Sequence, residues 1–199
     1  MRYRIIVLRD NQRPGPPSLI EAIDNNRLAI HDQGHEIFGV FGSLLGLATN
    51  EVYLVTYGET ELALQLPDSI TTVSDRAFMP TVRPTTHEPA NSPGVYVFRW
   101  FSVNPSTVKE IADLSAAAWP DFESSFDTRV QGLFAEDQTD PETMLLITWY
   151  RNLTVWEASR HPPQNARDNF LRRHKLTLNA LPIATSLLSA DGHNLVSHR

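Results

Sequence analysis

Residues 94–103 combine aromatic side chains with one arginine, a pairing that could bind a small molecule. Because successive residues of a strand point to opposite faces, Tyr96 shares one face with Phe98 and Trp100, while Arg99 lies on the other. A charged side chain in the middle of a strand needs a partner or solvent. A ligand cavity lined by rings with one or two polar groups would meet that need. The alternative is hydrophobic core with Arg99 at its wet edge, and the pattern does not say which face would line a cavity.

A second basic feature lies between residues 151 and 175, where six basic residues stand against only two acidic ones. The forked guanidinium of arginine suits carboxylates and phosphates, so this segment could recognise an anionic group. The alternative is a solvated helix face. Arg160 or Arg167 is favoured as the functional arginine, because we expect Arg172, Arg173 and Lys175 to face outward. The candidate ligand-binding residues are Arg99, Tyr96, Trp149, Tyr150, Arg160 and Tyr57.

Residue types that carry covalent or metal chemistry are few. The chain has no cysteine, which excludes disulfides, thiolate catalysis and cysteine-held metals. No serine nucleophile elbow, phosphate-binding glycine loop or dinucleotide fingerprint is present. His31 and His35 have the spacing of two ligands on one helix face, but Gly34 between them predicts that the helix has ended. A haem held by His174 would want apolar neighbours, and His174 has charged ones. We therefore expect no metal and no cofactor, and the sequence assigns no catalytic residue.

The elements that must position these side chains belong to a chain of ordinary globular composition. Its 199 residues are 41% hydrophobic and 20% charged, which predicts a folded protein. No run approaches the roughly 18 to 20 apolar residues of a membrane span, and the apolar run at residues 5–8 is short for a secretion signal. We therefore expect a cytoplasmic protein without membrane contact. The net charge of −6 argues against nucleic-acid binding.

An internal repeat decides the architecture. At an offset of 93 positions, Gly39 and Phe41 coincide with Gly132 and Phe134, and Tyr57 coincides with Tyr150. Apolar residues fall on apolar residues around these identities, and the helical segments match better at an offset of 92. Repeats of this kind indicate two copies of one structural unit.

Periodicity predicts the same order of elements in both halves: strand, helix, strand, strand, a weaker helical piece and a last strand. The expected helices and strands include a helix over 18–30, strands near 37–44, 51–57 and 94–103, a helix from 105, and strands over 131–136 and 143–151. This order is the ferredoxin-like βαββαβ unit. Each sheet would be covered by helices on one face only, so the bare faces must be buried. We therefore predict an α+β fold of tandem ferredoxin-like repeats packed sheet to sheet as an α+β barrel.

The predicted domain boundaries follow the repeat. Residues 1–88 form the first ferredoxin-like repeat and residues 94–188 the second, joined by a stiff linker with four prolines within 80–93. Residues 189–199 are predicted to be a flexible tail. Each repeat alone would leave a sheet face bare and would be unstable, so we expect the chain to fold as one body.

The second half also resembles a known family. The run 94–101, the segment 103–108, and the strand 144–151 followed by a helix with Arg160 and Arg167 resemble the NIPSNAP family of the dimeric α+β barrel superfamily. The resemblance covers residues 94–188 and, more faintly, the first half. It implies the ferredoxin-like fold and a homodimer. Its superfamily includes cofactor-free monooxygenases, haem-degrading enzymes and haem-binding chlorite dismutase-like proteins.

The sequence leaves three functions open. The favoured one is a NIPSNAP-like protein that binds a small hydrophobic or aromatic molecule between its sheets. The second, implied by the resemblance, is a cofactor-independent monooxygenase or isomerase-like enzyme with a tyrosine or histidine as acid or base. The third is a non-catalytic dimeric interaction protein without a pocket. No nucleic-acid or membrane partner is expected.

Overall fold

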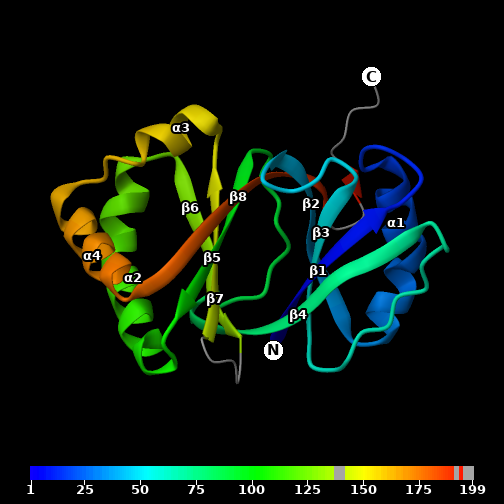
Figure 1. Ribbon diagram of the computed structural model, residues 1–199, viewed down its shortest axis with the longest axis horizontal. Helices are drawn as coiled ribbons and strands as arrows, with labels where there is room; N and C mark the ends of the chain where they lie inside the picture. Colours follow the sequence, from blue (N-terminus) through cyan, green and yellow to red (C-terminus); the bar gives the residue numbers. More distant parts are fainter. Residues whose placement is uncertain (137–141, 191–192, 195–199) are drawn as a thin grey trace. The chain divides into compact units, whose positions relative to one another are not determined.

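The computed structural model describes residues 1–136, 142–190 and 193–194 (Figure 1). Its elements are β1 (Arg2–Asp10), α1 (Pro17–Asp32), β2 (His35–Leu45), β3 (Glu51–Gly58), β4 (Ile70–Arg83), β5 (Val95–Val103), the 3-10 turn η1 (Pro105–Thr107), α2 (Val108–Ser125), β6 (Thr128–Glu136), β7 (Glu142–Tyr150), α3 (Leu153–Ala158), α4 (Gln164–Lys175), β8 (Thr177–Ala190) and β9 (His193–Asn194). Within these described ranges, none of the helices has the length and apolar content to cross a membrane.

The chain divides into two compact units. The first unit comprises Met1–Phe78, His87–Pro93 and the described residues from Ala184 onward, and the second comprises Met79–Thr86 and Gly94–Ile183. Strands β4 and β8 each contribute their first part to one unit and their second part to the other. The boundaries 1–88 and 94–188 follow the sequence repeat instead, and they stay a prediction. Of the predicted tail, Ser189 is buried and pairs with Val40 in the first unit, and residues 191–192 and 195–199 lie outside the described residues.

Each unit contains an antiparallel sheet with the ferredoxin-like strand arrangement. In the first unit, β3 lies between β1 and β2, β4 pairs with the other edge of β1, and the second part of β8 pairs with β2. In the second unit, β7 lies between β5 and β6, with β8 next to β5 and the second part of β4 next to β6. The predicted α+β class and tandem ferredoxin-like topology are confirmed.

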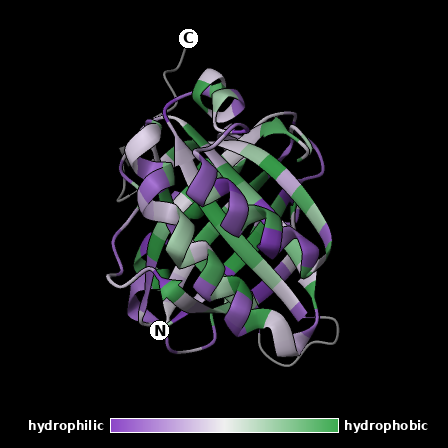
Figure 2. Cartoon of the chain, turned by 90° about the vertical axis from the view of Figure 1, so that its left-hand side faces the viewer, coloured by the Kyte–Doolittle hydropathy of each residue, from purple (hydrophilic) through white to green (hydrophobic). Residues whose placement is uncertain are grey.

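Helices cover one sheet face in each unit (Figure 1). In the first unit, α1 packs Leu19 and Ile23 onto a core that includes Ile6 and Leu54. In the second unit, α2 and α4 lie side by side, and Figure 2 shows purple and green stretches alternating along them. Such alternation is expected of helices that bury one stripe and expose the other.

The two units differ between their third and fourth strands. In the second unit this connection carries the helices α3 and α4. In the first unit residues 59–69, all of them described, form neither helix nor strand, although a weak helical piece is predicted there. Leu62, Leu64 and Leu66 from this segment pack against the helix-side core of the first unit.

The repeated glycines have the same structural role in both units. The β2–β3 pairing shifts register between Ile37 and Gly39, and the β6–β7 pairing shifts between Val130 and Gly132. Such a bulge bends a strand and lets the ring two residues later lie over the glycine. A Cβ on Gly39 would come within 2.7 Å of the Phe41 ring, and one on Gly132 within 2.3 Å of the Phe134 ring. The repeat therefore preserved a bulge with its covering ring.

The match of Tyr57 with Tyr150 in the sequence repeat differs by one residue from the correspondence that the strand pairing gives. Ile6 pairs with Leu54 in the first unit, and its counterpart Arg99 pairs with Leu146 in the second. The third strands therefore correspond at an offset of 92, so Tyr57 corresponds to Trp149, and Gly58 to Tyr150. Because strand faces alternate, this one-residue slip places Tyr57 and Tyr150 on opposite faces.

Candidate ligand-binding site

A cavity of about 570 Å³ lies within the second unit, between one sheet face and the helices that cover it. Its floor comes from β5, β6 and β7, and its walls come from α2, the α3–α4 connection, α4 and the first part of β8. It is lined by Val97, Arg99, Phe101, Trp119, Phe122, Val130, Leu146, Thr148, Tyr150, Ser159, Arg160, His161, Pro162, Arg167, Phe170, Leu171, Arg173, His174, Thr177, Ala180 and Pro182. Its size falls within the range of about 300 to 1,000 Å³ typical of small-molecule sites.

Aromatic rings form much of the cavity wall. Trp119 and Phe122 come from α2 and are buried, and Phe170 comes from α4. The Phe122 ring meets the Phe170 ring edge-on at 5.4 Å between centroids, and it meets the Tyr150 ring at 6.5 Å. Rings in such edge-to-face contacts form a stiff apolar wall on which a flat ligand could lie.

The strand alternation places Arg99 in this cavity. Val97, Arg99 and Phe101 of β5 line it, so this face of the strand points to the helices. Tyr96 is buried in the second unit and does not line the cavity. On β7, Thr148 and Tyr150 line the cavity, while Trp149 falls on the alternate face.

Arg173 also lines the cavity, and its side chain is 6% exposed. The expectation that Arg173 faces outward is therefore wrong, because α4 turns this residue toward α2 and the sheet. Its Nη1 donates a hydrogen bond to Ser115 Oγ at 3.2 Å. Its guanidinium carbon lies 4.7 Å from the centroid of the Phe170 ring and 5.4 Å from that of Phe101. Two ring faces and one hydroxyl thus replace water around a cation.

No carboxylate within the described ranges pairs with Arg99 or Arg173. Burial, and after it the neighbouring Arg99, lower the pKa of Arg173 to about 9, while Tyr150 acts in the opposite direction. Burial also lowers the pKa of Arg99, with Tyr150 opposing and Arg160 adding to the shift. Both guanidinium groups remain protonated at neutral pH, so the cavity holds two cations that burial destabilises.

Tyr150 stands beside these cations. Burial raises the pKa of its phenol, and Arg99, the Ser159 hydroxyl, Arg173 and the Thr148 hydroxyl act in the opposite direction. The phenol is therefore neutral at physiological pH and can donate a hydrogen bond into the cavity.

Exposed basic side chains complete the lining. Arg160, His161, Arg167 and His174 are all exposed, which places them where the cavity meets solvent. The Arg160 guanidinium carbon lies 5.8 Å from the centroid of the Trp156 ring. Among the described residues that line the cavity there is no aspartate or glutamate.

The predicted site residues therefore separate into two groups. Arg99, Tyr150 and Arg160 come together at the cavity, whereas Tyr96 and Trp149 belong to the same unit but not to the lining. Tyr57 lies in the first unit, where its hydroxyl donates to the backbone oxygen of His87 at 3.1 Å.

Sequence reasoning missed Arg173, Trp119 and Phe170 as cavity residues. One signal could have found Arg173. Ala166, Phe170 and Arg173 are spaced by four and three residues, the spacing of a single inward helix stripe. An arginine at the end of such a stripe lies on the face of the helix that packs against the core.

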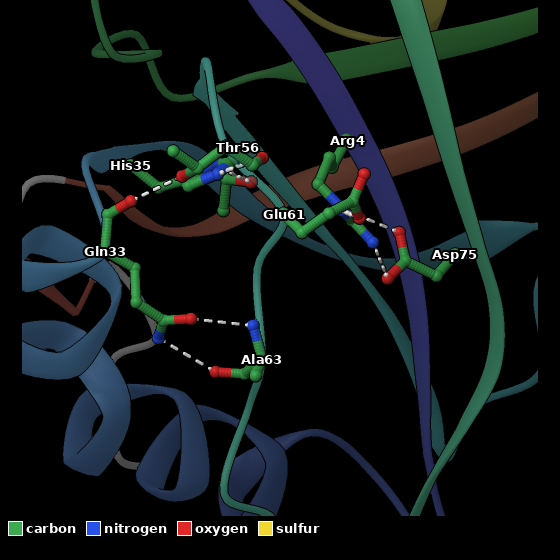
Figure 3. Close-up of polar contacts among 8 residues, drawn as sticks. Arg4, Gln33, His35, Thr56, Glu61, Ala63 and Asp75 are labelled. Carbon is green, nitrogen blue, oxygen red and sulfur yellow. Dashed lines mark hydrogen bonds and ion pairs between the residues drawn. The ribbon is translucent and has the colours of Figure 1, made fainter.

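In the first unit, leucines of residues 59–69 pack onto the corresponding core, and Figure 3 shows some of the polar contacts that hold this segment. Ile6 stands in place of Arg99, and Gly58 stands in place of Tyr150. The His35 ring packs against Gly58, so close that a Cβ there would lie 2.6 Å from its Nδ1. His35 Nε2 lies 2.9 Å from the Thr60 backbone oxygen, which ties residues 59–69 to this ring.

Further hydrogen bonds hold residues 59–69 over the first unit's core. Gln33 bonds both the N–H and the carbonyl of Ala63, at 2.8 and 3.0 Å (Figure 3). Asn26 does the same for Gln65, at 2.8 and 2.9 Å. These paired bonds fix the backbone of a segment that has no secondary structure of its own.

In the described part of the chain, His, Asp and Glu side chains do not form a group of three or more that could hold a metal ion. The His31 side chain is 70% exposed, while His35 is buried and bonded to Thr60.

Comparison with known proteins shows the fold. No family model and no curated protein matches the sequence. An anthrone oxidase-like protein of known structure has a TM-score of 0.67 at 12% identity, with 98% of this chain and 97% of that chain covered. A putative monooxygenase from Fusobacterium nucleatum has a TM-score of 0.59 at 10% identity, covering 94% and 93%. Chlorite dismutase from Candidatus Nitrospira defluvii has a TM-score of 0.61 at 8% identity, covering 94% and 90%.

Identities this low show a shared fold and nothing finer. The chain has the ferredoxin-like α+β fold of antibiotic biosynthesis monooxygenase-type proteins and of chlorite dismutase.

Proposed function

We propose that this chain is a NIPSNAP-like protein whose second unit binds a small hydrophobic or aromatic molecule in the 570 Å³ cavity. The observation that carries the proposal is a cavity of ligand size walled by Trp119, Phe122 and Phe170, with polar groups at fixed places. The sequence predicts a ligand between the sheets. The proposal instead uses the helix-covered face, because Arg99 and Tyr150 line the cavity there.

The experiment is a thermal-shift screen of one- to three-ring aromatic compounds, compared between the native protein and Leu146→Phe. Leu146 lines the cavity, and the larger ring would occupy ligand volume. Compounds that bind the folded protein raise its Tm, and the rise grows with the ratio of their concentration to their Kd. We expect such shifts to disappear in Leu146→Phe. A screen in which no compound raises the Tm, or in which Leu146→Phe responds as the native protein does, contradicts the proposal.

A second candidate function is a cofactor-independent oxygenase. It is favoured by the phenol of Tyr150 next to two cations, since such a group could exchange a proton with an acidic carbon or hydroxyl of an aromatic substrate. The names of the structures that share the fold, anthrone oxidase-like protein and putative monooxygenase, point in the same direction. In a balanced form, an activated CH2 group would react with O2 to give a carbonyl and one water molecule.

Oxygen consumption distinguishes this enzyme from a binder. Compounds found in the thermal-shift screen are incubated with protein in an oxygen-electrode cell, with Tyr150→Phe as the comparison. An oxygenase consumes O2 in proportion to product, and Tyr150→Phe slows it while retaining binding. A protein that binds the compounds and consumes no O2 is a binder.

The homodimer expected from the family resemblance stays a proposal. Size-exclusion chromatography with light scattering tests it, and a monomer at every concentration contradicts it. Haem binding through His174, which lines the cavity, is tested by the Soret absorbance of protein mixed with haem. Lack of a shifted Soret band eliminates that alternative.

A further inference from the structure

We infer that the molecule bound in the second unit's cavity is an anion, an aromatic or hydrophobic carboxylate whose acidic group pairs with Arg173 and Arg99. The inference rests on the proposed function, because it names the chemical class of that ligand. It is carried by a charge that the described part of the protein leaves without a counterion.

The first step is the buried position of the charge. Arg173 is 6% exposed, and its described partners are the Ser115 hydroxyl and the faces of two aromatic rings. A guanidinium has five N–H donors, and one hydroxyl uses one of them. A buried cation is costly unless an anion pairs with it, and the described residues supply no such anion to the remaining donors.

The second step is that the arginines act together. Arg99 lines the same cavity as Arg173, and it lies close enough to lower the pKa of the Arg173 guanidinium. Two cations that repel one another in a buried site are both stabilised when one carboxylate lies between them. Like charges packed without compensation point to a ligand of opposite charge.

The third step is the contrast with other arginines of the chain. Arg4 in the first unit pairs with Asp75, at 2.5 and 3.1 Å, and with Glu61. Arg83, also in the second unit, pairs with Glu123 at 2.7 Å while its guanidinium covers a ring. Arg4 and Arg83, both on strands of these sheets, each have a carboxylate partner. Arg99 and Arg173 have a cavity instead.

The surroundings favour an acid with an apolar body. The chain carries 23 acidic and 17 basic residues, yet the described lining of this cavity contains four arginines, two histidines and no acid. The aromatic wall suits a ring system, and the exposed Arg160 and Arg167 at the solvent side attract an anion from solution.

The experiment uses three probes of one shape and three charges: 2-naphthoate, neutral 2-naphthamide and cationic 2-naphthylmethylamine. Isothermal titration at pH 7 measures the Kd of each for the full chain. We expect 2-naphthoate to bind at least about tenfold more tightly than 2-naphthamide, and the amine to bind worst. Arg173→Met is expected to abolish this preference while the Kd of 2-naphthamide stays the same.

Arg172→Met is the matched control. Arg172 directly precedes Arg173 in α4, is 65% exposed and does not line the cavity. Its replacement removes the same charge from the same helix. We expect it to leave the acid-to-amide preference intact, and Arg173→Lys to restore part of it. Far-ultraviolet circular dichroism and Tm verify that each variant is folded.

Two results overturn the inference. One is an affinity of the native protein for the acid that does not exceed its affinity for the amide, and the other is equal loss of preference in Arg172→Met and Arg173→Met. Failure of the proposed function is a different result, since then none of the three probes binds, the neutral one included. Binding of the amide alone would support the cavity and contradict the anion.

Discussion

Arg4 of the first unit lies between two carboxylates, whereas Arg99 and Arg173 of the second lie in a cavity with no described carboxylate in reach. The two units share strand order, bulges and a helix-covered sheet face. The repeat therefore provides an internal comparison. The first unit packs leucines of residues 59–69 onto its core, and the second unit has a cavity between its sheet and helices.

The connection after the third strand makes the difference. In the first unit, residues 59–69 place Leu62 in the core and are held by Asn26 and Gln33. In the second unit the same connection forms α3 and α4, which stand over the sheet and bring Arg173 with them. In the first unit the segment buries its leucines in the core, whereas in the second unit a cavity remains between the helices and the sheet.

The largest expected effect tests what the two units share. Gly132→Ala places a methyl group 2.3 Å from the buried Phe134 ring, so either the ring or the bulge must move. We expect it to lower the free energy of unfolding by about 3 kcal/mol, the upper part of the range for overpacked cores. Urea unfolding measures it, with Gln131→Ala in the same strand as control. Gly39→Ala in the first unit is expected to behave alike, and tolerance at one glycine only would break the equivalence.

The next effect separates the units. Leu54→Phe and Leu146→Phe alter corresponding positions of β3 and β7. Leu54 is fully buried in a filled core, so we expect a loss of about 2 kcal/mol, typical of overpacking. Leu146 borders the cavity, so its replacement is expected to cost less than about 1 kcal/mol. Both are measured by urea unfolding without ligand, and equal losses would mean that the cavity offers no room.

A third prediction concerns the arginines. Arg173→Met removes a buried cation and leaves an apolar chain among rings, so we expect it to stabilise the ligand-free protein by about 1 to 2 kcal/mol. Arg4→Met removes the partner of Asp75 and is expected to lower the Tm. Thermal unfolding of both variants checks the opposite signs. Destabilisation by Arg173→Met would indicate that this arginine serves the fold.

The smallest effect is the pH dependence of that stabilisation. Burial lowers the pKa of Arg173 to about 9, below the ordinary value of arginine, so the cost of burying its charge is present in full below pH 9 and is relieved above it. The stability advantage of Arg173→Met is therefore expected to be constant from pH 6 to 8. It should shrink by up to about 1 kcal/mol between pH 9 and 10. Urea unfolding at each pH measures it, and an advantage that grows above pH 9 has the wrong sign.

Much of the fold could be predicted because its signals are local. Alternation along residues 94–103 placed Arg99 and Tyr96 on different faces, and this predicted strand formed as β5. Gly39 and Gly132, which are identical in the repeat, lie at bulges. Glycine is typical of such positions because a side chain there would meet the covering ring. The weak helical piece after the first unit's third strand did not form, because the segment is held by tertiary hydrogen bonds to Asn26 and Gln33.

The candidate site could be predicted only in part. Arg99, Tyr150 and Arg160 were found because charge and aromatic content stand out in sequence. Tyr57 is also an aromatic residue of a predicted strand, but a slip of one residue in the repeat places it and Tyr150 on opposite faces. Arg173 was excluded because the rotation of a short polar helix about its axis depends on what it packs against.

The sequence by itself determined the order of the strands and of each unit's first helix, the duplication, the alternation of strand faces and the lack of cysteine chemistry, since each depends on residue type and spacing alone. Only the tertiary structure decided which copy is filled and which is hollow, and that Arg173 is buried beside Arg99. Side-chain packing determines which unit has the cavity. The same strand face can be closed by a bonded segment or bridged by helices, and the difference arises from contacts between residues far apart in the chain.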